Sequence, residues 1–233
     1  MHRFCIAALS FALILPTCWA KPTPVSHAHG KFQGTLKLKP MDDGVHMSVL
    51  ERFSYADLDG NSLEAAPGFQ TDGASIPRAL WTLIGSPFTG KYVKAAVVHD
   101  VGCVNHKYTW QTTHRMFYEA MIDSGVSEDY AKVLYFGVRL GGPRWTLETA
   151  EARSLEDLHQ EVGSGTIIGQ IEKKVTPGIA GGRTTYFARF YKPIPPKQLT
   201  DQDVLRFQDE VEQRRLSRLP ITLTEIDGRT EKP

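Results

Sequence analysis

The chain has 233 residues and a formal net charge of +1, with 27 basic and 26 acidic side chains. This balance argues against nucleic-acid binding and against docking on an anionic membrane surface, because both need an excess or a stripe of positive charge. Two of the three cysteines lie within the first twenty residues, so Cys103 has no partner for an internal disulfide. The fold must therefore be held by its core or by a bound ion.

The first twenty residues have the pattern of a secretory signal peptide. A positively charged start, residues 1–3, precedes an apolar run over residues 4–15, and Ala20 supplies the small residue at the end. The apolar run of about twelve residues is shorter than the ~20 that span a bilayer, so we predict cleavage after Ala20 and no stable membrane span. Lipidation of Cys18 is the lesser alternative. We expect an exported protein, periplasmic or secreted, in which residues 21–32 form a flexible arm.

The pattern of residues 33–70 predicts a small antiparallel sheet. Apolar and polar residues alternate over 34–39 and 45–55, and a possible third strand covers 62–66. The segments 41–44 and 57–61 contain glycine with acidic residues, which is typical of tight turns between antiparallel strands.

A group of helices is expected after the sheet. Residues 91–101 place Tyr92, Ala95, Ala96 and His99 at helical spacing, so His99 lies on an apolar face. The expected starts of the four helices are Ser75, Lys91, Thr112 or Thr113, and Ser127.

The composition changes after residue 145. We predict a first domain over residues 33–145 and a mostly helical C-terminal extension over residues 146–233, which gives an α+β fold class. An apolar stripe on a charged helix is formed by Leu147, Ala150, Leu155, Leu158 and Val162. A possible strand covers 184–191, and Thr200 with Asp203 resembles a capping box for a last helix through about Arg215.

Four polar residues of the middle segment are expected to meet. In an antiparallel helix pair over residues 91–123, His99 and Asp100 close the first helix and His114 opens the second, so both imidazoles reach one end of the hairpin. Asp72 lies in the turn before the first predicted helix. His99 and Asp100 are about 100° apart on their helix, so they point in different directions.

The leading interpretation of this cluster is a divalent metal site. Asp72, His99, Asp100 and His114 would supply its ligands, with zinc as the first choice because imidazole and carboxylate suit zinc. Three protein ligands and an open position would let the metal activate water for hydrolysis.

Other interpretations stay open. In one of them His99 is a general base while Asp100 holds calcium, the second choice of metal. Cys103 with His114 as base, and a triad of Ser75, His99 and Asp72, are further arrangements, although helix capping explains Ser75 better. Each of these side chains also has an ordinary structural role in a folded core.

Three motifs resemble the DUF1353 family of small bacterial and phage proteins. They are Pro67–Arg78, Ala95–Asp100 and Arg115–Met121, and the resemblance covers roughly residues 45–142. The family tends to place an aspartate near the position of His114. The resemblance implies a compact α+β domain, often in a phage or cell-envelope context, and no established catalytic mechanism.

Two functions follow as hypotheses. The first is an exported, metal-assisted hydrolase of an envelope substrate such as peptidoglycan or phospholipid, with His99 and Asp100 as catalytic residues. The second is a non-catalytic envelope or phage-derived binding protein, whose partner contacts residues 146–233. Outside the cluster, Arg139 and Arg144 are weaker candidates for an anion site, since solvated positions at a helix end are the ordinary interpretation.

Overall fold

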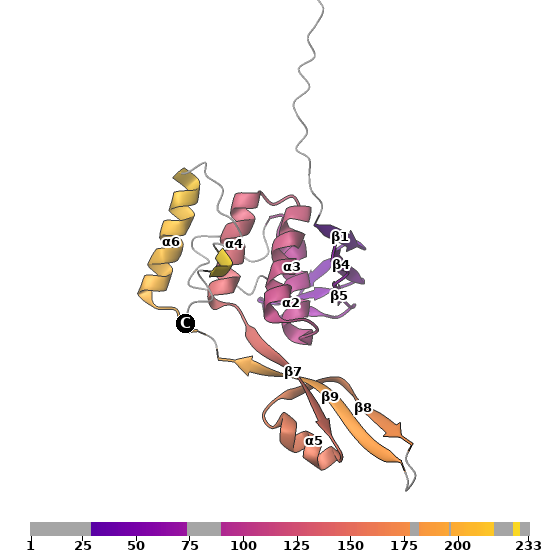
Figure 1. The fold of residues 1–233 in the computed structure, drawn as a ribbon. Coiled ribbons are helices and arrows are strands. Elements are labelled where there is room, and N and C mark those ends of the chain that lie inside the picture. Colours follow the sequence, from indigo (N-terminus) through magenta and orange to yellow (C-terminus); the bar gives the residue numbers. More distant parts are fainter. Residues whose placement is uncertain (1–28, 74–89, 178–181, 196, 217–225, 229–233) are drawn as a thin grey trace, which may run out of the picture.

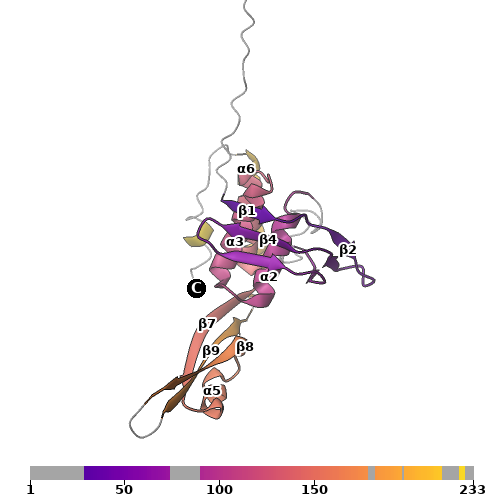
Figure 2. The same cartoon turned by 90° about the vertical axis from the view of Figure 1, so that its right-hand side faces the viewer.

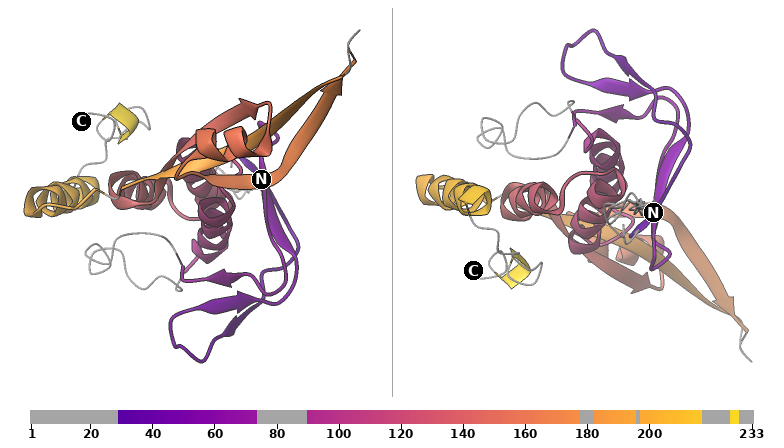
Figure 3. Two further views of the ribbon diagram at one scale, coloured as in Figure 1. Left: turned by 90° about the horizontal axis from the view of Figure 1, so that it is seen from below. Right: turned by 90° about the horizontal axis from the view of Figure 1, so that it is seen from above.

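The computed structural model describes residues 29–73, 90–177, 182–195, 197–216 and 226–228, without the side chains of 210, 211 and 213–216. Within this part, a small β-structure packs on a pair of helices, and two more helices follow outward on the other side (Figures 1 and 3). A separate three-stranded arm projects away from the helices. The α+β class predicted from the sequence is therefore confirmed.

The elements follow one another along the chain without long excursions. The first half contains β1 (Gly30–Gln33), β2 (Leu38–Pro40), β3 (Met47–Val49), β4 (Phe53–Asp57), β5 (Ser62–Ala65), β6 (Gln70–Thr71), α2 (Val93–Asn105) and α3 (Trp110–Asp123). The second half contains α4 (Glu128–Gly141), β7 (Arg144–Ala152), α5 (Leu155–Val162), β8 (Thr166–Thr176), β9 (Arg183–Ile194) and α6 (Asp201–Leu216).

The predicted N-terminal sheet is antiparallel but divided in two. The strand orders are β1-β4-β5 and β2-β3-β6. Of the expected strand over 34–39, only residues 38 and 39 are in a strand, β2, because Gly34 with its φ of 82° ends the extended conformation of β1. The expected strand over 45–55 is divided between β3 and β4. The larger sheet covers α2 and α3 (Figure 2), and its inward residues Phe53 and Tyr55 are fully buried.

The helix pair α2 and α3 carries the main core. Both are antiparallel neighbours as predicted, and α2 buries a continuous stretch from Ala95 to Gly102. The start of α3 was predicted too late, at Thr112 or Thr113. The helix begins at Trp110 because Thr109 is the N-cap and its side chain accepts a hydrogen bond from the Thr112 amide. Ser127 occupies the N-cap of α4 as predicted, and the helix predicted after Ser75 lies outside the described residues.

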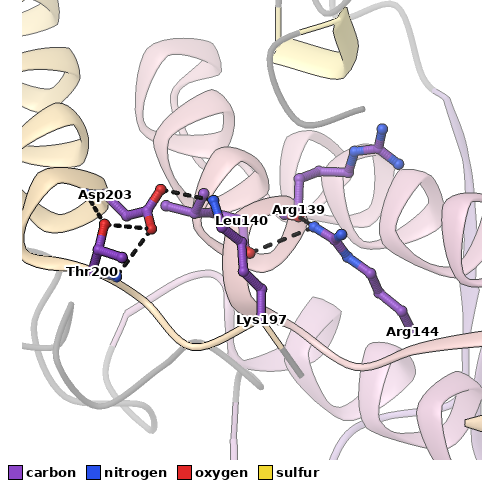
Figure 4. Close-up of polar contacts among 6 residues, drawn as sticks. All are labelled: Arg139, Leu140, Arg144, Lys197, Thr200 and Asp203. Carbon is purple, nitrogen blue, oxygen red and sulfur yellow. Dashed lines mark hydrogen bonds and ion pairs between the residues drawn. The ribbon is translucent and has the colours of Figure 1, made fainter. Parts of the chain in front are cut away.

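The outer helices stack on this pair in sequence. Helix α4 packs on α3, and α6 packs on α4 through the stacked rings of Phe136 and Phe207, 5.8 Å apart. The capping box of α6 is confirmed: the Thr200 amide donates to the Asp203 carboxylate, and the Asp203 amide donates to the Thr200 hydroxyl (Figure 4). These bonds and Lys197 lower the pKa of Asp203 to about 2, with Lys197 as the first cause.

The predicted helical stripe over residues 147–162 is wrong in its first half. Residues 144–152 form β7, which pairs along its whole length with β9 in a sheet of order β7-β9-β8. Apolar residues at 147 and 150 fit a helix, but the ladder to the predicted strand at 184–191 overrides that local pattern. Only 155–162 is helical, and Leu158 and Val162 bury its inner face against the sheet. The extension therefore combines a β-arm with helix α6.

The root of the arm is anchored to the loop between α2 and α3. The Trp145 indole donates to the Tyr108 carbonyl at 3.0 Å, and Arg189 donates to the Lys107 carbonyl at 3.2 Å. His106, in a left-handed conformation with φ of 51°, stacks on the Tyr191 ring at 3.6 Å. The described part of the chain contains no helix with both the length and the apolar character that crossing a bilayer requires.

Gly102 allows the closest approach between α2 and α3. A Cβ at this position would lie 2.5 Å from Thr113 Cγ2 and 3.0 Å from Leu63 Cδ1. We predict that Gly102→Ala lowers the free energy of unfolding by about 1–3 kcal/mol through overpacking, although alanine favours the helix.

Urea denaturation measures this effect, with Val104→Ala on the exposed side of the same helix as control. Adding Thr113→Ala should recover much of the loss, because it removes the crowding atoms. Equal stability of Gly102→Ala and the native chain would contradict the close approach.

Candidate functional site

The α2–α3 hairpin brings the two predicted imidazoles together. Nε2 of His99 lies 2.8 Å from Nδ1 of His114, and both residues are 0% exposed. One nitrogen carries the hydrogen of this bond and the other accepts it. The pair is enclosed by aromatic rings, with Phe117 at 4.9 Å from His99 and Trp110 at 5.4 Å from His114, both measured between ring centroids.

Cys103 is the third member of this neighbourhood. It lies one turn after His99 on α2 and is half-buried. Its Sγ is 3.8 Å from Nδ1 and 3.7 Å from Nε2 of His99. Nearly equal distances to both nitrogens place the sulfur away from the lone-pair direction of either one, so the imidazole is poorly oriented to take the thiol proton.

Asp100 points away from the imidazoles, as its helical position predicts. Its Oδ2 accepts a hydrogen bond from the Thr71 hydroxyl, and that hydroxyl accepts one from the Gly73 amide at 3.2 Å. Asp100 is 5% exposed, so the contact ties α2 to the turn that follows β6. Asp72, in the same turn, is exposed and makes no described contact with the other three predicted residues.

Burial keeps both imidazoles neutral. It lowers the pKa of His99 to about 3. The pKa of His114 is well below its usual value, first because of burial and then because a charge on His114 would be repelled by a proton on His99 and by the guanidinium groups of Arg139 and Arg144. Nε2 of His114 has no hydrogen bond of normal geometry within the described residues, although the nearby Pro143 carbonyl counteracts the shift in part.

The described side chains do not fit a metal ion at this position. No group of three His, Cys, Asp or Glu residues in the described part of the chain is arranged to hold one. The facing nitrogens of His99 and His114 share a hydrogen, and the guanidinium groups of Arg139 and Arg144 oppose a cation near the outer nitrogen of His114. Zinc or calcium binding stays a prediction for metal analysis.

Arg139 and Arg144 are not the solvated side chains that their sequence positions suggested. Both guanidinium groups lie over the Trp110 ring, at 4.5 Å and 4.9 Å from its centroid. Arg144 also donates to the carbonyl groups of Arg139 and Leu140 at the end of α4 (Figure 4). A cation at the C-terminus of a helix interacts favourably with its dipole.

A polar pocket on the outer side of α3 was missed by the sequence analysis. It has a volume of about 270 Å³ and lies between the β4–β5 turn, α3 and α4. The turn contributes Asp57 and Asp59 to one wall, and α3 contributes Glu119 to the same region. Burial first, and then the negative charges of the acidic neighbours, raise the pKa of Glu119 to about 7, although Arg115 counteracts them.

The opposite wall of the pocket is basic and already holds a carboxylate. Asp227, from the short C-terminal segment Ile226–Gly228, accepts a hydrogen bond from the Tyr135 hydroxyl at 2.9 Å. The same carboxylate lies 3.5 Å from Nε of Arg139 and 3.8 Å from the Arg115 guanidinium. Helical spacing was the available signal, since Tyr135 and Arg139 are four residues apart and so are Arg115 and Glu119.

Comparison with known proteins shows that the middle of the chain is similar to a described family. Residues 47–138 match the model of the family described as "Protein of unknown function (DUF1353)", which confirms the predicted resemblance over that range. The matched range contains His99, His114, Asp100 and most of the polar pocket, whereas Arg139 and Asp227 lie beyond it.

Two curated relatives come from Sinorhizobium fredii (strain NBRC 101917 / NGR234). The chain is 43% identical to "Uncharacterized protein y4iH" over 103 residues, which are 44% of this chain and 43% of the relative. It is 40% identical to "Uncharacterized protein y4jT" over 124 residues, which are 53% of this chain and 37% of the relative. The chain therefore spans less than half the length of either relative. No solved structure matches the chain at a significant level.

The depressed pKa of the buried imidazoles predicts acid sensitivity. An unfolded histidine takes up a proton below its usual pKa of 6.5, whereas folded His99 stays neutral down to about 3. Each buried histidine therefore contributes stability that is present above pH 6.5 and falls by up to about 1.4 kcal/mol per pH unit below it.

Urea denaturation at pH 7, 6 and 5 tests this, and His99→Gln should flatten the slope by about one proton. His159→Gln, at an exposed position of α5, is the matched control. Glu119 changes the pH dependence of stability in the opposite direction between pH 4.5 and 7, because its pKa is raised in the folded state. This contribution is the same in all three proteins. An unchanged slope in His99→Gln would contradict the buried neutral pair.

Proposed function

We propose that the DUF1353-like part of this chain is a non-catalytic binding domain of an exported envelope or phage-derived protein. The observation that carries the proposal is the closed hydrogen-bonded pair of His99 and His114, which is 0% exposed and surrounded by aromatic rings. A catalytic imidazole must touch substrate and have a pKa near the working pH. A buried pair with a strongly lowered pKa meets neither condition and instead fixes the helix hairpin.

The polar pocket supports the same proposal from the outer side of α3. It combines an acidic wall with a basic wall over rigid helices. Concave sites of this kind with a few fixed polar groups are the usual binding sites for ligands. In this proposal the His99–His114 pair on one face of α3 has a structural role, and the pocket on the other face binds the ligand.

A metal-assisted hydrolase of an envelope substrate is the second candidate. It is favoured by the position of the half-buried Cys103 beside His99, which gathers a thiol, two imidazoles and the Asp100 carboxylate at one hairpin. In this candidate the described face of the pair would have to open to substrate and the imidazoles would have to separate.

Metal analysis distinguishes the two candidates. The chain, equilibrated with zinc or with calcium and then desalted, should contain no stoichiometric ion, and its melting temperature should be unchanged by chelator. His99→Ala should lower the free energy of unfolding by about 2–4 kcal/mol, because a buried ring is removed and His114 loses its partner.

The control is His159→Ala at an exposed helix position, which should leave the melting temperature unchanged. One bound ion per chain that is lost in a folded His99→Ala variant would sink the binding-domain proposal and support the hydrolase.

Export is the remaining part of the proposal, and it rests on the sequence of residues 1–20. Expressed from its full sequence in a Gram-negative host, the protein should accumulate in the periplasm with Lys21 as its first residue. N-terminal sequencing and intact mass measure this directly. A mass that includes Met1, or a lipid on Cys18, would contradict simple cleavage after Ala20.

A further inference from the structure

The basic wall of the polar pocket has the features of a carboxylate-binding site. Arg115 comes from α3, and Tyr135 and Arg139 come from adjacent turns of α4, so two rigid helices fix the three donors. All three are directed at one carboxylate group, that of Asp227. Arginine and tyrosine donors in fixed positions are the usual means of recognising a carboxylate.

Burial makes this wall specific for an anion. The Arg139 side chain is 1% exposed and lies over Trp110, so its charge is held in place within the protein. A buried cation is costly unless an anion accompanies it. Tyr135 is almost fully buried, and its pKa is raised by burial first and by Asp227 second, so its hydroxyl keeps the proton that it donates.

The occupant is a short segment from outside the matched family range. Asp227 is 92 residues away from Tyr135 in the sequence. The preceding residue, Ile226, is 0% exposed and packs into the main core. Among the described residues, the contact includes a buried aliphatic anchor and a carboxylate, two groups that a short peptide ligand can supply.

We propose that Arg115, Tyr135 and Arg139 bind a peptide segment in which a carboxylate follows an aliphatic residue, and that Ile226–Asp227 occupies this site within the chain. An acidic segment of a partner protein binds by displacing it. The proposal rests on the binding function proposed above and names its ligand class.

Because Ile226–Asp227 already occupies the site, an external peptide must compete with this segment of the same chain. A tethered segment has an effective concentration of roughly millimolar, so it masks the site from weaker external peptides. The acidic wall formed by Asp57, Asp59 and Glu119 lines the same pocket and disfavours a second acidic group there. The ligand that fits these charges best has one carboxylate at the position of Asp227 and no further acidic group toward the acidic wall.

Fluorescence anisotropy with a labelled peptide tests the proposal. The probe has the sequence of residues 222–231, and the control peptide has asparagine in place of the aspartate that corresponds to Asp227. The proteins are the full native chain, Asp227→Asn, and Asp227→Asn combined with Tyr135→Phe. Asp227→Asn is nearly isosteric and weakens the internal occupant, while Tyr135→Phe removes only the donated hydroxyl.

The expected result is peptide binding by Asp227→Asn with a Kd about tenfold or more lower than by the native chain, since one charged hydrogen-bonding group is worth that factor. The asparagine peptide, and the addition of Tyr135→Phe, should each raise the Kd again by about tenfold. Arg115→Gln, at a side chain that is 42% exposed, should act in the same direction as Tyr135→Phe.

Three outcomes would overturn the proposal. One is a folded Asp227→Asn chain that does not bind the peptide, and the second is binding that ignores both Tyr135→Phe and the asparagine peptide. If Asp227→Asn melts at a lower temperature, the native peptide at about millimolar concentration must raise that temperature and the asparagine peptide must not. Absence of this rescue is the third.

Failure here is separable from failure of the proposed function. A chain that carries no metal and binds no peptide overturns the peptide site alone. A stoichiometric metal ion overturns the binding-domain proposal whatever the peptide does.

Discussion

The close packing of α2 against α3 is the contact on which the rest of the molecule depends. At its centre the two buried imidazoles share a hydrogen bond of 2.8 Å. One turn away, Gly102 leaves room for the Thr113 side chain, so the two helices pack closely. The sheet covers one side of this pair, α4 covers the other, and the β-arm is anchored to the connecting loop. Each outer element thus takes its position from this hairpin.

A buried polar pair is stable in such a place only when its members satisfy one another. Neutral imidazoles suit this role, because one donates and the other accepts without burying a charge. Asp100 completes the arrangement from the opposite side of α2 by holding the turn after β6 through Thr71. The polar residues of the hairpin therefore fix how α2 packs on α3 and on the turn after β6. The lowered pKa values of the two imidazoles result from the same burial.

A pocket lined by ionic and polar groups lies instead on the outer side of α3 and α4. There the arginine and tyrosine side chains meet the carboxylate of a segment far along the chain, beside acidic groups of the β4–β5 turn. The two faces of α3 thereby differ in charge: the face toward α2 is closed and neutral, and the other face lines an ionic pocket. A binding role follows more naturally from the ionic face than catalysis does from the closed one.

Local pattern determined much of this protein. The period of apolar residues located α2, α3 and α4, the capping box located α6, and the spacing of His99 and His114 in a hairpin was enough to bring the imidazoles together. These features depend on interactions within one or two helical turns or across one short loop, which is why the sequence alone carries them.

Tertiary structure decided the features that depend on distant segments. Residues 144–152 became a strand because β9 pairs with them, and Arg139 became a buried ligand of Asp227 because the C-terminal segment returns to α4. Whether the imidazoles face a cleft or each other was also open in the sequence. Side-chain spacing gives the face of a helix, but burial and partner are set by what other elements pack against that face.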